Sequence, residues 1–82
     1  MPELSHLRAA IALAEEGHFG RAARRLHLTQ PPLSRQVRLL EETLGVRLFE
    51  RTPQGAVPTP AGLAFLPGAR AALRAAEAAG QA

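Results

Sequence analysis

Apolar residues recur at helical spacing from the start of the chain. At about 100° per residue such positions share one face, which predicts a helix from about Glu3 to Glu16. Gly17 suits its C-terminal stop. Leu13 falls on the opposite side and predicts a second contact surface, such as one for a partner. The positions on the shared face are Leu4, Leu7, Ile11 and Ala14.

A shorter apolar stripe follows and predicts a helix of about two turns over residues 19–26. The next two residues, His27 and Leu28, leave room only for a tight turn between helices. The stripe consists of Phe19, Ala22, Ala23 and Leu26.

The clearest periodicity in the chain predicts a third helix over about 30–44. Its apolar residues fall within an arc of roughly 60°. Thr29 is a good N-cap, the prolines after it suit a first helical turn, and Gly45 suits the C-terminal stop. The apolar arc contains Leu33, Val37, Leu40 and Leu44.

Two short extended runs, residues 46–51 and 56–58, flank the turn-like segment 52–55 and predict a β-hairpin. A cap-and-proline signal then opens an alanine-rich helix from Pro60 to about Ala79. We expect Pro67 to kink or loosen this helix, because it lacks a backbone donor. The order helix, short helix, tight turn, helix, hairpin and long helix predicts a mainly α winged helix-turn-helix fold.

Length and charge narrow the functional classes. The chain has 82 residues, enough for one small domain, and its formal net charge of +3 points to an anionic partner such as nucleic acid or a membrane surface. It has no Cys, which excludes disulfides and thiolate chemistry. The His residues show no metal-binding spacing, and no glycine-rich phosphate loop is present. We therefore expect no enzymatic activity, no metal and no cofactor, and a cytoplasmic protein without signal peptide or membrane span.

Polar and basic side chains on the third helix fit contacts with DNA bases. Gln30 can bond adenine bidentately, and Pro31 can contact a thymine methyl group. Arg35 and Arg38 can reach guanine or phosphate, and Ser34 can reach either a base or a phosphate. A helix that enters the major groove needs such side chains opposite an apolar back face.

A simpler alternative is that Arg35 and Arg38 are solvated charges, paired with Glu41 and Glu42 at helical spacing. For an isolated amphipathic helix this alternative is the better one. The basic second helix and the hairpin that follows favour DNA contact instead.

Residues 22–37, with the sequence AARRLHLTQPPLSRQV, resemble the N-terminal DNA-binding domain of LysR-type transcriptional regulators. Residues 40–41, 44–45, 48–51 and 59–62 continue the resemblance as Leu-Glu, Leu-Gly, Leu-Phe-Glu-Arg and Thr-Pro-Ala-Gly. The resemblance covers essentially the whole chain, and the combination at these spacings is highly specific.

The resemblance implies a winged helix-turn-helix DNA-binding domain over residues 1–58 and a linker helix over 59–82 that pairs in a homodimer. Two recognition helices, about 30–44, would enter the major groove of an interrupted palindrome in double-stranded DNA, with the wing, about 46–58, near the minor groove. Full-length family members form dimers or tetramers and sense small-molecule effectors through a C-terminal domain, which these residues do not include.

The resemblance also assigns residue roles. Base contacts fall to Gln30, Pro31, Ser34 and Arg35. Contacts with phosphate, or support of the wing, fall to Arg21, Thr29, Arg38, Arg51 and Gln54.

Two departures from the family pattern affect these roles. His18 and Gly20 stand where hydroxyl residues are usual, which predicts the loss of a good cap for the second helix. His18 is then either a phosphate contact or an exposed spectator. Gln54 stands at the wing tip in place of a cation, so it can only hydrogen-bond in the minor groove.

The last helix carries an apolar side for which two interpretations exist. It either covers the domain's own core or pairs with a second copy, and the helix is longer than a domain this small can cover. We therefore favour dimerisation. A winged-helix protein-interaction module without DNA reading is the alternative function, and a membrane-surface helix is weaker because Arg70 and Arg74 are its only cations. The apolar side consists of Phe65, Leu66, Ala69, Ala72, Leu73 and Ala76.

Overall fold

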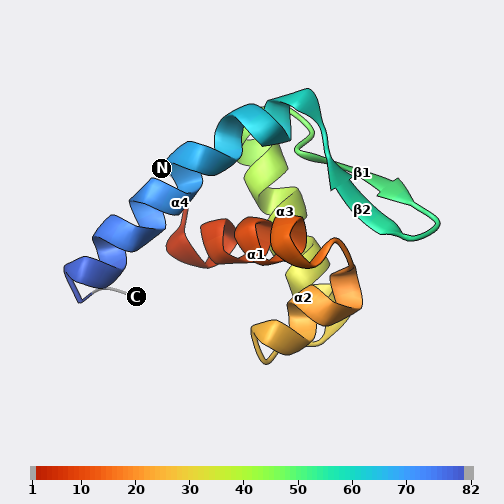
Figure 1. Ribbon diagram of the computed structural model, residues 1–82, viewed down its shortest axis with the longest axis horizontal. Coiled ribbons are helices and arrows are strands. Elements are labelled where there is room, and N and C mark those ends of the chain that lie inside the picture. The colour runs from red at the N-terminus through yellow and green to blue at the C-terminus, as the bar shows by residue number, and fades with distance from the viewer. Residues whose placement is uncertain (1, 81–82) are drawn as a thin grey trace.

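A computed structural model, which describes residues 2–80, contains four helices and one two-stranded antiparallel sheet within that range (Figure 1). The predicted mainly α winged helix-turn-helix architecture is confirmed. Residues 1, 81 and 82, at the outer ends of the predicted parts 1–58 and 59–82, lie outside the described residues. In chain order the elements are α1 (Leu4–Glu16), α2 (Phe19–Arg25), α3 (Gln30–Leu44), β1 (Phe49–Thr52), β2 (Gly55–Pro58) and α4 (Pro60–Ala78).

Helix α1 is the centre of the core, because α2, α3 and α4 all pack against it. It ends at Gly17, whose φ of 68° is left-handed and whose amide bonds the Leu13 carbonyl. Leu13 is fully buried, so the prediction of a partner surface there is wrong. The surrounding helices cover both sides of α1. Its buried residues are Leu7, Ala9, Ala10, Ile11, Ala12 and Leu13.

Helices α2 and α3 form the helix-turn-helix within one residue of the predicted bounds. His27 adopts a left-handed φ of 59°, and the Leu28 amide bonds the Ala23 carbonyl at 2.8 Å, which keeps the turn tight. Thr29 occupies the N-cap position of α3, but its side chain makes no capping hydrogen bond. The core-facing side of α3 buries Leu33, Val37 and Leu40.

The wing is a shorter hairpin than the sequence predicted. Strand β1 begins at Phe49 rather than Val46, and Thr52 already pairs with Gly55, so only two residues form the turn. The Glu41 carboxylate accepts hydrogen bonds from the amides of Leu48 and Phe49. This side chain of α3 therefore binds the backbone at the point where β1 begins.

Hydrogen bonds of Thr59 connect the start of helix α4 to the loop before the wing. The Thr59 hydroxyl accepts from the Gly62 amide at 3.0 Å and donates to the Arg47 carbonyl at 2.6 Å. A Cβ at Gly62 would overlap the Leu48 carbonyl oxygen, so this helix position requires glycine.

Pro67 lies inside α4, and the helix continues on both sides of it. The carbonyl left without a donor belongs to Leu63, which is 62% exposed, so water can hydrogen-bond it. The C-terminal half of α4 extends beyond the rest of the domain (Figure 1). No helix within residues 2–80 combines the length and the apolarity needed to cross a bilayer.

Candidate nucleic-acid interface

The outward face of α3 carries the side chains predicted to contact bases. Gln30, Pro31 and Arg35 are exposed, and Ser34 is half-buried. All four belong to the first two turns. Because the opposite face of α3 packs in the core, this polar face is held outward.

The arginines of α3 are not engaged within the domain. Within residues 2–80, no ion pair or hydrogen bond joins Arg35 or Arg38 to another side chain. Glu41 points instead to the wing, where the Leu48 amide lies 2.8 Å from its carboxylate. The pairing of α3 arginines with neighbouring glutamates is therefore absent, and both guanidinium groups keep their donors available.

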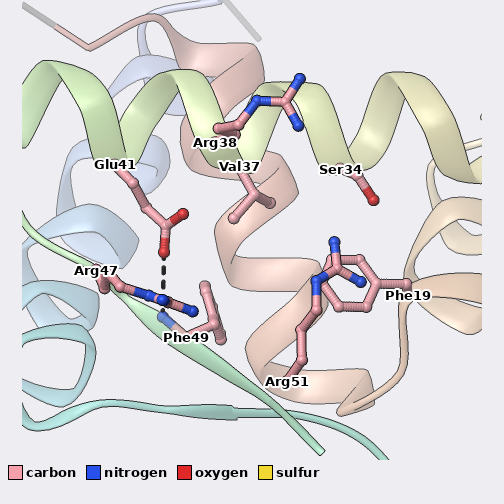
Figure 2. A pocket seen from close by; sticks show the side chains of 8 residues that line it. All are labelled: Phe19, Ser34, Val37, Arg38, Glu41, Arg47, Phe49 and Arg51. Atoms are coloured by element: carbon pink, nitrogen blue, oxygen red, sulfur yellow. Dashed lines mark hydrogen bonds between the residues drawn. The ribbon is translucent and has the colours of Figure 1, made fainter.

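A hollow of about 290 Å³ separates α3 from the beginning of the wing (Figure 2). Ser34 and Arg38 line it from α3, and Arg47 and Arg51 line it from the other side. Glu41 is the single acid among its lining residues, and backbone amides already bind its carboxylate. Three guanidinium groups and a hydroxyl around one hollow suit an anion with several oxygens, such as a phosphate.

The ring of Phe19, from α2, supports the side chain of Arg51, from β1. The Arg51 guanidinium carbon lies 4.2 Å from the ring centroid, which is cation–π geometry (Figure 2). Phe19 is half-buried and Arg51 is exposed. The contact therefore links the wing to the first residue of α2.

A second hollow, of about 250 Å³, lies at the tip of the wing. Its lining includes Gln30 from the start of α3, Gln54 from the wing turn and His18 from the start of α2. The fold thus brings the predicted wing-tip residue and the first predicted base-reading residue to the same recess.

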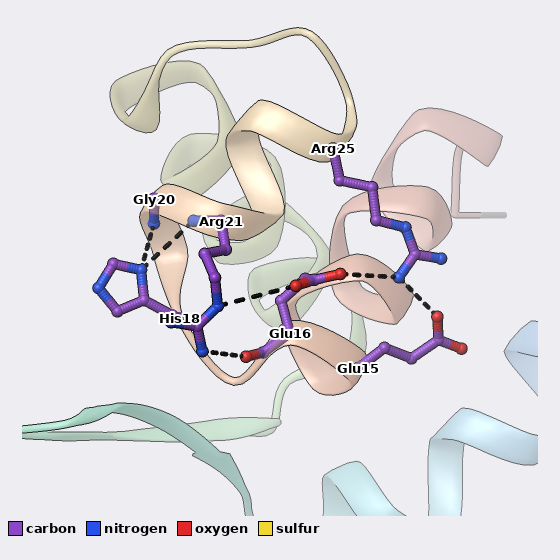
Figure 3. A network of polar contacts seen from close by, with 6 residues as sticks. All are labelled: Glu15, Glu16, His18, Gly20, Arg21 and Arg25. Carbon is purple, nitrogen blue, oxygen red and sulfur yellow. Dashed lines mark hydrogen bonds and ion pairs between the residues drawn. The ribbon is translucent and has the colours of Figure 1, made fainter.

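His18 caps α2, which corrects the expected loss of a cap. Its Nδ1 accepts hydrogen bonds from the amides of Gly20 at 3.0 Å and Arg21 at 3.3 Å (Figure 3). The backbone of His18 is extended, as N-cap geometry requires. Because Nδ1 accepts, the ring proton of the neutral imidazole lies on Nε2. A Cβ at Gly20 would lie 3.0 Å from the His18 ring, so the small residue makes room for the imidazole.

Arg21 has a partner inside the domain. Its guanidinium donates to the backbone carbonyl of Glu16 at 2.7 Å and lies 3.8 Å from the Glu16 carboxylate (Figure 3). This contact satisfies a free carbonyl at the end of α1. The residue predicted to contact phosphate therefore also joins α1 to α2.

A chain of ion pairs continues from this contact across three helices. Arg25 of α2 lies 2.6 Å from the Glu15 carboxylate and 3.5 Å from that of Glu16, and Arg70 of α4 lies 3.5 Å from Glu15. The hydrogen bond from Arg25 lowers the pKa of Glu15 below its ordinary value of 4.5. The same contact raises the pKa of Arg25.

The side of α4 predicted to dimerise divides into two groups. Leu66 and Ala69 are buried in the domain's own core, which leaves them little surface for a second copy, although Ala69 also lines the groove described next. Ala72 is exposed, and with Phe65 it lines an apolar groove of about 350 Å³ between α4 and the start of α1. Leu73 and Ala76 are half-buried.

Sequence reasoning did not identify Phe19 or Glu41 as contributors to this interface, and it offered His18 as a phosphate contact or a spectator rather than as the cap of α2. The sequence pattern places Phe19 in an apolar stripe and Glu41 at helical spacing from the arginines of the third helix. Their partners lie on other elements, so no local spacing indicates these contacts. The extended residue before α2 was the one usable signal, because an imidazole at that position can accept from helix amides.

Comparison with known proteins gives a consistent result. The family described as "Bacterial regulatory helix-turn-helix protein, lysR family" matches residues 4–63. The transcriptional regulator ClcR of Pseudomonas putida is 55% identical over 75 residues, which are 92% of this chain and 26% of that protein. The regulator AlsR of Bacillus subtilis is 56% identical over 71 residues, which are 87% of this chain and 24% of that protein. The chain thus spans about a quarter of the length of these curated relatives.

Two solved structures have the same fold. The CbnR DNA-binding domain in complex with DNA is 47% identical, with a TM-score of 0.90 over 95% of this chain and 90% of that one. The BenM DNA-binding domain in complex with benA site 1 DNA is 44% identical, with a TM-score of 0.85 over 92% of this chain and 84% of that one.

Proposed function

Because this chain belongs to the LysR family of bacterial regulatory helix-turn-helix proteins, we propose that it is the part of a transcriptional regulator that binds double-stranded DNA sequence-specifically. The binding is non-covalent. It needs no cofactor and takes place in the bacterial cytoplasm, at the nucleoid. Residues 1–58 contact DNA and residues 59–82 form the linker to a second copy.

One observation carries the proposal: α3 presents Gln30, Ser34 and Arg35 on its outward face, without a side-chain partner among residues 2–80, while its other face packs in the core. Such a helix fits the major groove, where amide and guanidinium groups read adenine and guanine edges. The DNA complexes of the CbnR and BenM domains, at 47% and 44% identity, support the same conclusion.

Within this proposal the residues divide into two roles. Gln30, Pro31, Ser34 and Arg35 contact base edges. The remaining contacts position the domain on the phosphate backbone or support the wing. The Thr29 hydroxyl makes no cap bond and is free to donate to a phosphate, and Arg21 has donors beyond those that Glu16 uses. The positioning residues are Arg21, Thr29, Arg38, Arg51 and Gln54.

The domain acts as a homodimer through α4 in this proposal. The groove lined by Phe65, Gly68 and Ala72 is an apolar surface on which a second copy can pack. The space above Gly68 is open, since an added Cβ would meet nothing within 4 Å, so a partner helix can approach closely. Leu73, which is partly buried against the core, and Ala76 continue the same side of α4 toward its C-terminus. Two-fold pairing places two copies of α3 in an interrupted palindrome. A full-length regulator would also form tetramers and bind a small-molecule effector.

The test is selection of binding sites from a random duplex library, followed by fluorescence anisotropy. The selected duplex and a scrambled duplex of equal composition are titrated at several salt concentrations. We expect an interrupted palindromic consensus, preference for it over the scrambled duplex, and affinity that falls steeply with salt. Salt-dependent binding without preference overturns sequence reading. No binding at low salt overturns DNA binding and favours the protein-interaction module.

A further inference from the structure

The stack of Arg51 on Phe19 is one of the contacts that join the wing to the helix-turn-helix beside the recognition helix. The guanidinium carbon is 4.2 Å from the ring centroid. Both residues line the same hollow as Ser34 and Arg38 (Figure 2). The stack therefore fixes where the Arg51 charge stands relative to α3.

Arg51 has no other anchor within the described part of the chain. Its guanidinium takes part in no ion pair or hydrogen bond there, and the neighbouring carboxylate, Glu50, lies 3.7 Å from Arg47 instead. An exposed arginine without an anchor samples many rotamers, and ordering it on binding costs free energy. A ring face restrains the plane of the guanidinium and leaves its N–H donors at the plane's edge free.

We propose that Phe19 is a positioning residue for DNA binding. Its ring holds the Arg51 guanidinium at the rim of the hollow, where the free donors meet a backbone phosphate while α3 lies in the major groove. The phosphate sits among Arg51, Arg38 and Ser34. This inference rests on the proposed function and adds Phe19 to the residues on which DNA affinity depends.

The charge pattern favours a phosphate over other occupants of the hollow. Arg38, Arg47 and Arg51 surround it, and the Glu41 carboxylate is turned to the Leu48 and Phe49 amides. A phosphate diester presents two unesterified oxygens, which can accept hydrogen bonds from more than one arginine. The hollow opens beside the outward face of α3, which is where the DNA backbone flanks a helix in the major groove.

A double-mutant cycle in DNA affinity tests the proposal. The variants are Phe19→Leu, which keeps an apolar side chain without a ring face, Arg51→Ala, and the two together. We expect Phe19→Leu to lower affinity by about two- to fivefold, the range of an exposed cation–π contact. Arg51→Ala should reduce the slope of log affinity against log salt by about 0.9, as loss of one phosphate contact does. In the Arg51→Ala background, Phe19→Leu should have no further effect.

Further variants separate positioning from packing. Phe19→Tyr keeps the ring and should bind DNA as the wild type does. Leu26→Ala removes a partly buried side chain at the other end of α2, and should lower thermal stability without changing the salt slope. If Phe19→Leu does not fold, Phe19→Met carries the same cycle.

The outcomes separate this inference from the proposed function. If wild-type protein binds no DNA, the proposed function itself fails. If the wild type binds DNA but Phe19→Leu lowers affinity equally with and without Arg51, Phe19 acts through packing alone and the inference is overturned. An unchanged affinity of Phe19→Leu overturns it as well.

Discussion

The amide of Ala56 donates a hydrogen bond of 3.1 Å to the carbonyl oxygen of Gly17. This bond ties β2 of the wing to the turn between α1 and α2, and together with the Glu41 bonds and the Arg51 stack it orients the wing beside the helix-turn-helix. The backbones approach so closely that a Cβ at Gly55 would overlap the Gly17 oxygen. Gly55 also has a φ of 143°, which other residues rarely adopt.

Gly55→Ala should therefore destabilise the fold. We expect its free energy of unfolding, from urea denaturation followed by circular dichroism, to fall by about 1–3 kcal/mol. The control is Ala71→Ser on the exposed side of α4, outside the groove lined by Phe65 and Ala72, where stability should change by no more than about 0.5 kcal/mol. Equal stability of the two variants would contradict the close docking of the wing.

The cap on α2 makes a prediction of its own. His18→Ala leaves the amides of Gly20 and Arg21 without their acceptor and should lower the free energy of unfolding by about 0.5–2 kcal/mol. His18→Asn can accept from the same amides and should retain most of the stability. If the Asn variant is as unstable as the Ala variant, capping is not what His18 contributes.

Local patterns predicted the elements of this fold well. The spacing of Leu33, Val37 and Leu40 defines α3 because a helix repeats every 3.6 residues, and Gly17 and Gly45 mark helix ends through their left-handed backbones. The outward face of α3 follows from the same period. Each of these features depends on residues within a few positions of one another.

Contacts between elements were not predictable in this way. Leu13 is buried because three helices surround α1, and Leu66 is buried because α4 lies on α1. The Arg51 stack on Phe19 and the Glu41 bonds to wing amides join residues on different elements. A single sequence carries no periodic signal for such pairs, so the hollow between α3 and the wing emerges only from the fold.

The carboxylate of Glu15 should make stability depend on pH. Because its pKa is lower in the folded chain than its ordinary 4.5, the ionised form stabilises the fold above that pH, and this stabilisation is lost as the pH falls through the folded-state pKa. Both partners are partly exposed, at 41% for Arg25 and 38% for Glu15, so the effect is at most about 1 kcal/mol.

Glu15→Gln should therefore be less stable than wild type at pH 7, and the difference should close as the pH falls below 4.5 or as salt is raised. Urea denaturation at several pH values measures this. Glu42→Gln is the control, since Glu42 is exposed and pairs with no cation within residues 2–80. A difference that grows at low pH would exclude the Arg25 contact as its cause.

Dimerisation through the groove on α4 predicts a sharp effect of Ala72→Glu. A carboxylate placed against the apolar groove lined by Phe65 and Leu4 is costly to bury, so analytical ultracentrifugation should show monomers where the wild type is dimeric. The fold should persist, because Ala72 is exposed. Leu63→Glu is the control: Leu63 is also exposed, and it lies roughly 180° around the helix from Ala72. Dissociation by Leu63→Glu alone would place the interface on the other flank of α4.

The outward face of α3 predicts two distinguishable classes of DNA-binding variant. Gln30→Ala and Arg35→Ala should each cost about 1–3 kcal/mol of binding free energy on the selected duplex and relax specificity at one base pair, while binding to scrambled duplex changes little. Arg38→Ala removes a charge at the hollow between α3 and the wing. It should weaken both duplexes alike and reduce the salt slope by about 0.9.

Anisotropy titrations of these variants on both duplexes at several salt concentrations provide the measurement. Arg74→Ala is the control, because Arg74 is an exposed arginine on α4, apart from the predicted interface, and should leave affinity and salt slope nearly unchanged. The two classes differ for a physical reason: a base edge offers its pattern of donors and acceptors only in the right sequence, whereas every nucleotide offers the same phosphate. If Gln30→Ala, Arg35→Ala and Arg38→Ala lower affinity equally on both duplexes, the division of α3 into base-reading and phosphate-binding residues is wrong.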